Sequence, residues 1–101
     1  IEKAVVTVDA CAGAVIDAAR AHGYEVVQIA DHGNADKMIA EDGGAFTAHT
    51  TNPVPLVLVD ASGSGLALSG AEGCLADIAP TLLAMIGLPQ PSEMTGESLL
   101  A

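Results

Sequence analysis

Two short apolar runs constrain the fold of this chain more than any other feature. Residues Tyr24–Ala30 read YEVVQIA, and residues Val54–Val59 read VPLVLV. Short runs rich in β-branched and aliphatic side chains are typical of strands that are covered on both faces by helices. The two runs therefore predict an α/β fold with two main strands, and the proline near the start of the second run is tolerated there.

Helical patterns lie on either side of these runs. Apolar residues recur at spacings of three and four from Ile1 to Ala19, which predicts an amphipathic helix over most of residues 2–21. Gly23 is expected to end this helix, and His22, in its last turn, is interpreted as a helix-end residue rather than a metal ligand.

A second helix is expected near the end of the chain. Asp77 can cap it, Pro80 fits its first turn, and the helix should run to about Ile86 and stop at Gly87. Between the second strand and this helix lies a loop rich in Gly and Ser, in which Leu66–Leu68 could add a short edge strand.

The length of 101 residues allows one small domain. The chain starts without Met, and the first helical pattern has no capping residue before it. We therefore expect residues 1–101 to be a piece of a longer chain.

The charge balance excludes several partners. Three basic residues stand against 13 acidic ones, for a net charge of −10, so neither nucleic acid nor a membrane surface is an expected partner. No apolar run reaches the roughly 20 residues of a membrane span, and no signal peptide is visible. Cys11 and Cys74 fit reduced core cysteines of a cytoplasmic protein, with a disulfide or a metal thiolate as the alternatives.

The candidate site follows the first run. Asp31 and His32 end it, Gly33 permits a bend that lets both side chains share one ion, and His49 stands just before the second run. A carboxylate with imidazoles suits Mn²⁺ or Zn²⁺ better than Ca²⁺. The alternative is that Asp31 caps a turn and His32 is an ordinary polar residue. If His49 approaches Asp31, the two strands must be antiparallel.

Four segments carry a resemblance to a known family. They are ADHGNADKM, TAHTTNPVPLVLV, LADIAPTLLAMIGL and PSEMTGESL, at Ala30–Met38, Thr47–Val59, Leu75–Leu88 and Pro91–Leu99. Together they resemble the C-terminal end of cofactor-independent (2,3-bisphosphoglycerate-independent) phosphoglycerate mutases, in the alkaline phosphatase superfamily. This resemblance implies part of a three-layer α/β/α domain that binds metal.

The resemblance also implies a chemistry. The family interconverts 3-phosphoglycerate and 2-phosphoglycerate in glycolysis through a phosphoserine, with two divalent metals, commonly Mn²⁺. Asp31 and His32 would bind one ion and His49 the other. The nucleophilic serine, further ligands and the substrate-binding domain would lie upstream, so residues 1–101 alone should be inactive.

Two alternatives remain open from the sequence. The chain could be a segment of another enzyme of the superfamily, such as a phosphopentomutase or a phosphatase, although HTTNPVP argues against this. It could also be a non-catalytic module that stands alone. In either case the apolar edges of a small sheet predict that the isolated segment self-associates.

Overall fold

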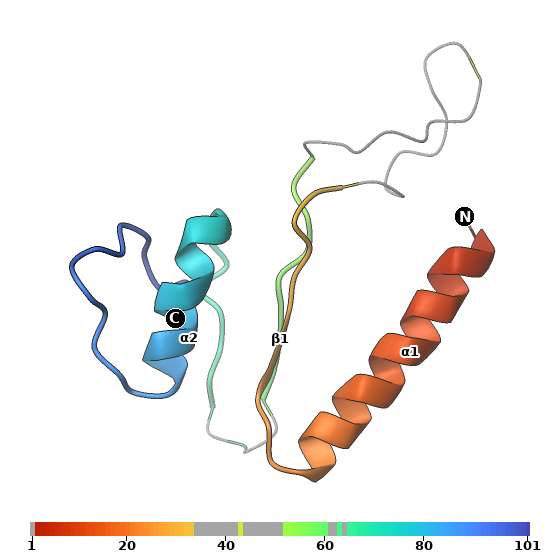
Figure 1. Ribbon diagram of the computed structural model, residues 1–101, viewed down its shortest axis with the longest axis horizontal. Coiled ribbons are helices and arrows are strands. Elements are labelled where there is room, and N and C mark those ends of the chain that lie inside the picture. Colours follow the sequence, from red (N-terminus) through yellow and green to blue (C-terminus); the bar gives the residue numbers. More distant parts are fainter. Residues whose placement is uncertain (1, 34–42, 44–51, 61–62, 64) are drawn as a thin grey trace. The chain divides into compact units, whose positions relative to one another are not determined.

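The computed structural model describes residues 2–33, 43, 52–60, 63 and 65–101. The chain divides into two compact units, Ile1–Ser62 and Gly63–Ala101, and each is described by itself. The first contains a helix and two strands, and the second a short 3₁₀ helix and an α-helix (Figure 1). Two antiparallel strands and two α-helices confirm the small α/β fold expected from the sequence.

Helix α1 covers Glu2–Ala21, as its periodicity predicts. Glu2 in the first turn and Arg20 in the last turn both complement the helix dipole. Gly23 ends the helix with a positive φ of 78°, and the N–H of Tyr24 donates back to the carbonyl of Ala19 over 2.9 Å. His22 is confirmed as a helix-end residue, because its Nδ1 lies 2.8 Å from the carbonyl oxygen of Ala18.

Strands β1 (Val26–Gln28) and β2 (Val57–Val59) form a two-stranded antiparallel sheet and run side by side in Figure 1. Val27 pairs with Leu58 at the centre of the register, which runs from the pair Val26–Val59 to the pair Gln28–Val57. The antiparallel direction is the one that the expected approach of His49 to Asp31 requires. Both strands are shorter than the apolar runs that predicted them, because only three residues of each run enter the pairing.

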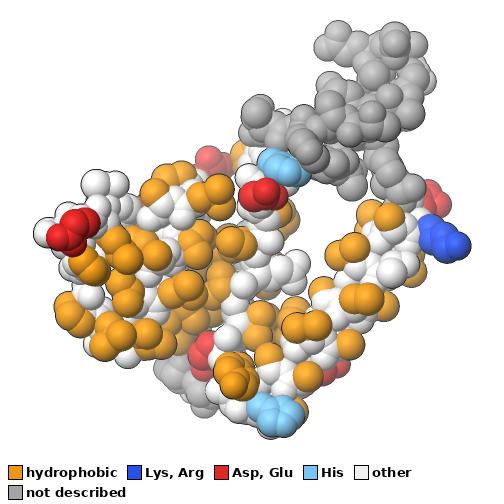
Figure 2. Space-filling view, in the orientation of Figure 1, with side chains coloured by type: hydrophobic (Ala, Val, Ile, Leu, Met, Phe, Trp, Pro, Cys, Tyr) orange, Lys and Arg blue, Asp and Glu red, His pale blue; other side chains and the backbone are white. Residues whose placement is uncertain are grey.

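The apolar face of α1 is only partly covered, since Ala12, Ile16 and Ala19 are half-buried. None of its residues is buried, and Val5, Val8 and Val15 are 50%, 66% and 68% exposed. Figure 2 shows hydrophobic side chains at the surface along this helix. The periodicity therefore predicted the helix correctly, but the described residues do not supply the core that its apolar face would pack against.

The second unit is built around helix α2 (Ile78–Met85), which follows directly on the 3₁₀ helix η1 (Leu75–Asp77). Gly87, with φ 74°, ends α2, and the N–H of Leu88 donates to the carbonyl of Leu83 over 2.9 Å. Pro80 and Thr81, in the first turn of α2, are the most deeply buried side chains of the described residues.

Two expectations for this unit need correction. Asp77 stands immediately before α2, but its side chain makes no capping bond to that helix. Its carboxylate instead accepts the N–H of Cys74, before η1, over 2.8 Å. Leu66–Leu68 does not form an edge strand, since only Leu68 pairs, in a single antiparallel bridge with Leu100.

Among the helices in the described part of the chain, none combines the length and the apolar character that crossing a membrane requires.

Candidate metal centre

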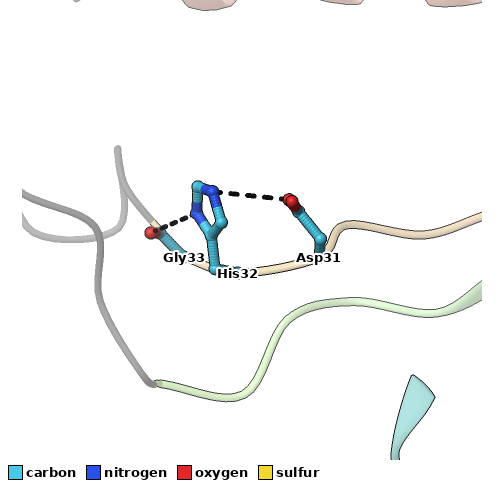
Figure 3. A network of polar contacts seen from close by, with 3 residues as sticks. All are labelled: Asp31, His32 and Gly33. Carbon is cyan, nitrogen blue, oxygen red and sulfur yellow. Dashed lines mark hydrogen bonds and ion pairs between the residues drawn. The ribbon is translucent and has the colours of Figure 1, made fainter. Parts of the chain in front are cut away.

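The candidate site begins where β1 ends. Strand β1 ends at Gln28, and the backbone then bends at Asp31 and His32 before the buried Gly33. In a straight strand the side chains of consecutive residues point to opposite faces. The bend brings the carboxylate of Asp31 and the imidazole of His32 to the same side of the chain, as Figure 3 shows.

Contacts of both ring nitrogens help to orient the imidazole of His32. Its Nδ1 lies 3.1 Å from the carbonyl oxygen of Gly33, and its Nε2 lies 3.5 Å from Oδ1 of Asp31 (Figure 3). A carbonyl oxygen can only accept a hydrogen bond, so Nδ1 carries a proton. The neutral imidazole then presents the lone pair of Nε2 toward the carboxylate. Two electron-rich atoms that face each other are a pair of donors that a metal cation could share.

The spacing of these two atoms fits a shared metal ion. Two metal–ligand bonds of about 2.1 Å at a tetrahedral angle place their ligand atoms about 3.4 Å apart. The distance of 3.5 Å from Nε2 of His32 to Oδ1 of Asp31 is close to that value. Nitrogen and carboxylate donors suit Zn²⁺ and Mn²⁺, and a backbone carbonyl on the other ring nitrogen is the usual way in which proteins orient a histidine ligand.

Solvent reaches the pair from outside. The side chains of His32 and Asp31 are 39% and 79% exposed, so an ion could enter without a structural rearrangement. Within residues 2–33, 43, 52–60, 63 and 65–101, however, no group of three metal-binding side chains comes together. Asp31 and His32 would therefore be two ligands of a site that needs more.

His49, the third expected ligand, lies outside the described residues. Asp77 is used in a different way, since both oxygens of its carboxylate accept backbone N–H groups. We therefore assign Asp77 a structural role within its own unit.

One contributor to the site was missed by the sequence analysis. Gly33 was expected only to permit a bend, but its carbonyl oxygen also fixes the ring of His32. A backbone carbonyl leaves no signature in a sequence, because every residue has one. Only the local backbone path decides which carbonyl a ring nitrogen meets.

A family match identifies the class of protein. The chain belongs to the Metalloenzyme superfamily, which matches residues 1–90.

The chain is also similar to particular named proteins. The chain is 54% identical, over 99% of its length, to the 2,3-bisphosphoglycerate-independent phosphoglycerate mutase of Parabacteroides distasonis. It is 56% identical over 98% of its length to the enzyme of the same name from Thiobacillus denitrificans, and 50% identical over 97% to that from Thermosynechococcus vestitus. The chain spans about a fifth of the length of these curated relatives, 19%, 19% and 20% respectively. The resemblance inferred from the sequence is confirmed.

Proposed function

We propose that residues 1–101 form part of the metal-binding domain of a phosphoglycerate mutase, and that Asp31 and His32 bind one of its catalytic metal ions. The observation that carries this proposal is the pairing of His32 Nε2 with Asp31 Oδ1 at 3.5 Å, in a chain 54% identical to a named mutase. His49 is proposed as a ligand of a second ion. Mn²⁺ is the proposed metal, and phosphoglycerate the proposed substrate.

The residues of this chain have limited and defined roles in that reaction. Asp31 supplies a carboxylate oxygen, and His32 supplies Nε2 while its Nδ1–H donates to the carbonyl of Gly33. A divalent pair, when bound, supplies an activated nucleophile and charge neutralisation on the phosphoryl oxygens. Holding the ring in one orientation keeps Nε2 aimed at the ion through turnover.

The chain does not carry the whole reaction in this proposal. The nucleophilic serine and the remaining ligands are placed outside residues 1–101. Lys3, Arg20 and Lys37 are the only basic residues besides histidine and are scattered along the sequence, whereas phosphate recognition usually clusters arginine or lysine. We therefore expect the 101-residue chain to show no mutase turnover with added Mn²⁺, and we propose a cytoplasmic, glycolytic role only for an enzyme that contains it.

A chimaera tests the proposed activity. The Parabacteroides distasonis enzyme would carry residues 1–101 in place of its own matching segment, and would be assayed with Mn²⁺ on 3-phosphoglycerate and on a phosphopentose. The proposal expects turnover of phosphoglycerate only. A chimaera that folds, as judged by its circular dichroism and melting transition, but turns over only the phosphopentose or neither substrate would contradict it.

A further inference from the structure

The end of the chain is fastened to the rest of the second unit by a regular set of backbone contacts. We call residues 97–101 the strap. The N–H of Ser69 donates to the carbonyl of Leu99, and the N–H of Ala101 donates to the carbonyl of Ala67, each over 2.8 Å. These two bonds flank the single bridge between Leu68 and Leu100. Residues 67–69 therefore hold one part of the strap by backbone pairing alone.

Two further N–H groups of the strap donate to side chains from the start of α2. The N–H of Glu97 donates to Oδ1 of Asp77 over 2.9 Å, while Oδ2 of the same carboxylate accepts the N–H of Cys74 over 2.8 Å. Residues 63–101 contain four acidic and no basic residues, so no cation of its own unit pairs with the Asp77 carboxylate. Its charge is stabilised by the N–H groups of Glu97 and Cys74 and by the Cys74 thiol. Charge-assisted bonds of this kind are about twice as strong as neutral ones.

Thr81 makes the second attachment. Its hydroxyl donates to the carbonyl of Asp77 over 2.7 Å and accepts the N–H of Leu99 over 2.9 Å. Thr81 is only 1% exposed, so water does not readily replace either bond. The Thr81 hydroxyl thus accepts the N–H of Leu99, which in a sheet would donate to a carbonyl of a neighbouring strand.

Two glycines leave room for this arrangement. A Cβ on Gly96 would collide with the carbonyl oxygen of Ala76 and lie 2.9 Å from Oδ1 of Asp77. A Cβ on Gly73 would lie 2.6 Å from Oδ2 of Asp77 and 2.8 Å from Cδ1 of Leu99. Neither glycine has a positive φ, so neither is required for its backbone conformation. The lack of a side chain at these positions instead lets the strap approach closely.

We infer that Asp77 and Thr81 form a clasp that fastens the strap across the start of α2, and that the strap opens and closes as one element while α2 stays folded. The contacts support separate opening for a physical reason. The strap is held mainly by four backbone N–H or C=O groups and by one buried side chain, Leu99, which is 9% exposed. Helix α2 keeps its own hydrogen bonds when the strap leaves, and local openings of this kind need less energy than global unfolding.

Amide hydrogen exchange resolved by residue tests the clasp on the complete 101-residue chain. In the unchanged protein the amides of Glu97, Leu99 and Ala101 should exchange at one shared opening free energy, lower than that of the α2 amides. Asp77→Asn keeps one acceptor oxygen but loses the second and the charge, and Thr81→Val keeps the shape but loses the hydroxyl. Each should speed exchange of all three strap amides by about tenfold, since one net hydrogen bond is lost.

Two control variants separate a clasp from general destabilisation. Thr81→Ser keeps the hydroxyl, and Glu93→Gln removes a charge from an exposed residue with no part in the clasp; both should leave strap exchange within about twofold of the unchanged protein. The inference would be overturned if the clasp variants changed the exchange rates of the three strap amides by unequal factors, or did not change them. So would strap amides that exchange at the same opening free energy as the α2 amides in the unchanged protein, because the strap would then not open separately.

Discussion

Nε2 of His32 lies 3.5 Å from Oδ1 of Asp31, while Nδ1 of the same ring is engaged by the carbonyl of Gly33. The contact with Gly33 explains the contact with Asp31. It assigns the ring proton to Nδ1 and turns Nε2 toward the carboxylate. A histidine beside an aspartate at a protein surface is common and contributes little to stability. A histidine whose other nitrogen is hydrogen-bonded to the backbone has the orientation that proteins commonly give to a histidine ligand.

Loss of either candidate ligand should be detected in the chimaera described above. We expect His32→Gln and Asp31→Asn each to reduce turnover of phosphoglycerate by at least about 100-fold, because even residues behind the ligands of a metal commonly contribute 10- to 100-fold. Added Mn²⁺ should restore part of the activity if affinity is what the substitution lowers. Steady-state assays across a Mn²⁺ titration give both quantities.

The matched control is the other histidine of the described residues. His22 bonds to the carbonyl of Ala18 at the end of α1, so His22→Gln should leave turnover within about twofold. Equal losses for His22→Gln and His32→Gln would remove the reason to assign His32 to the metal.

Self-association is expected from the partly uncovered face of α1. Val5, Val8 and Val15 are all at least half exposed, and their spacing places them along the helix within reach of a partner surface. The net charge of −10 opposes association at low salt, so sedimentation should show larger species as protein concentration and ionic strength rise.

Val15→Glu should reduce this association, whereas Ser92→Glu adds the same charge to an exposed residue of the second unit and tests charge alone. A chain that stays monomeric at high salt and high concentration would count against the prediction.

Removal of the Thr81 hydroxyl should lower the free energy of unfolding of the second unit. Thr81→Val leaves the N–H of Leu99 without the hydroxyl that accepts it in a buried position, at a cost of about 1–3 kcal/mol. Thr81→Ser should cost less, since it keeps both hydrogen bonds and loses one methyl group. Urea titrations followed by circular dichroism measure the difference, and equal costs for Val and Ser would contradict the assigned role.

Acid should weaken the attachment of the strap. The N–H of Glu97, followed by that of Cys74, holds the pKa of the Asp77 carboxyl below its ordinary value of 3.8. A lowered pKa in the folded state stabilises folding above the unfolded value, and this stabilisation is lost as pH falls through the folded value. The strap should therefore be fully held above about pH 3.8 and loosen below it.

The groups nearest to Asp77 do not reverse this pH dependence, in which the strap loosens as pH falls. The Cys74 thiol also lowers the pKa of Asp77, and Glu97 contributes its backbone N–H. In Asp77→Asn the amide shift of Leu99 should lose its dependence on pH below about 3.8, while Glu93→Gln should retain it. An identical pH dependence in all three proteins would contradict the role given to Asp77.

Glycine substitutions should separate steric from conformational effects. Gly96→Ala introduces a collision with the carbonyl of Ala76 and should prevent the strap from seating. Gly87→Ala meets no atom within 4 Å but has a φ of 74°, so it should cost only about 1–2 kcal/mol. Gly13→Ala, in open space within α1, should raise helix stability by about 1 kcal/mol. Thermal melts of the three variants give this order, and a Gly96→Ala protein as stable as Gly13→Ala would refute the steric argument.

Local patterns made most of the fold predictable. The spacing of apolar residues gave helix α1 its bounds, and Gly23 and Gly87 ended helices as expected. The antiparallel pairing of β1 with β2 followed from an argument about ligands rather than from strand composition. These features depend on neighbours in sequence or on one simple geometric condition.

Features that depend on distant neighbours could not be predicted in the same way. Asp77 was expected to cap the helix that follows it, but its carboxylate turns back to Cys74 and across to Glu97, 20 residues away. Thr81 gave no signal of its contact with Leu99, since a threonine in a helix usually bonds only its own preceding turn. The ligands that would complete a site around Asp31 and His32 are equally a matter of tertiary structure.

The most direct test of the account is the effect of Mn²⁺ on the histidine ring signals of the 101-residue chain in solution. Paramagnetic broadening falls steeply with distance, so substoichiometric Mn²⁺ should broaden the His32 ring protons first and leave those of His22 sharp. Asp31→Asn should require more Mn²⁺ for the same broadening, and Asp17→Asn, on exposed α1, should not. Equal broadening of His22 and His32, or none at any Mn²⁺ concentration, would contradict the claim that Asp31 and His32 hold a metal ion.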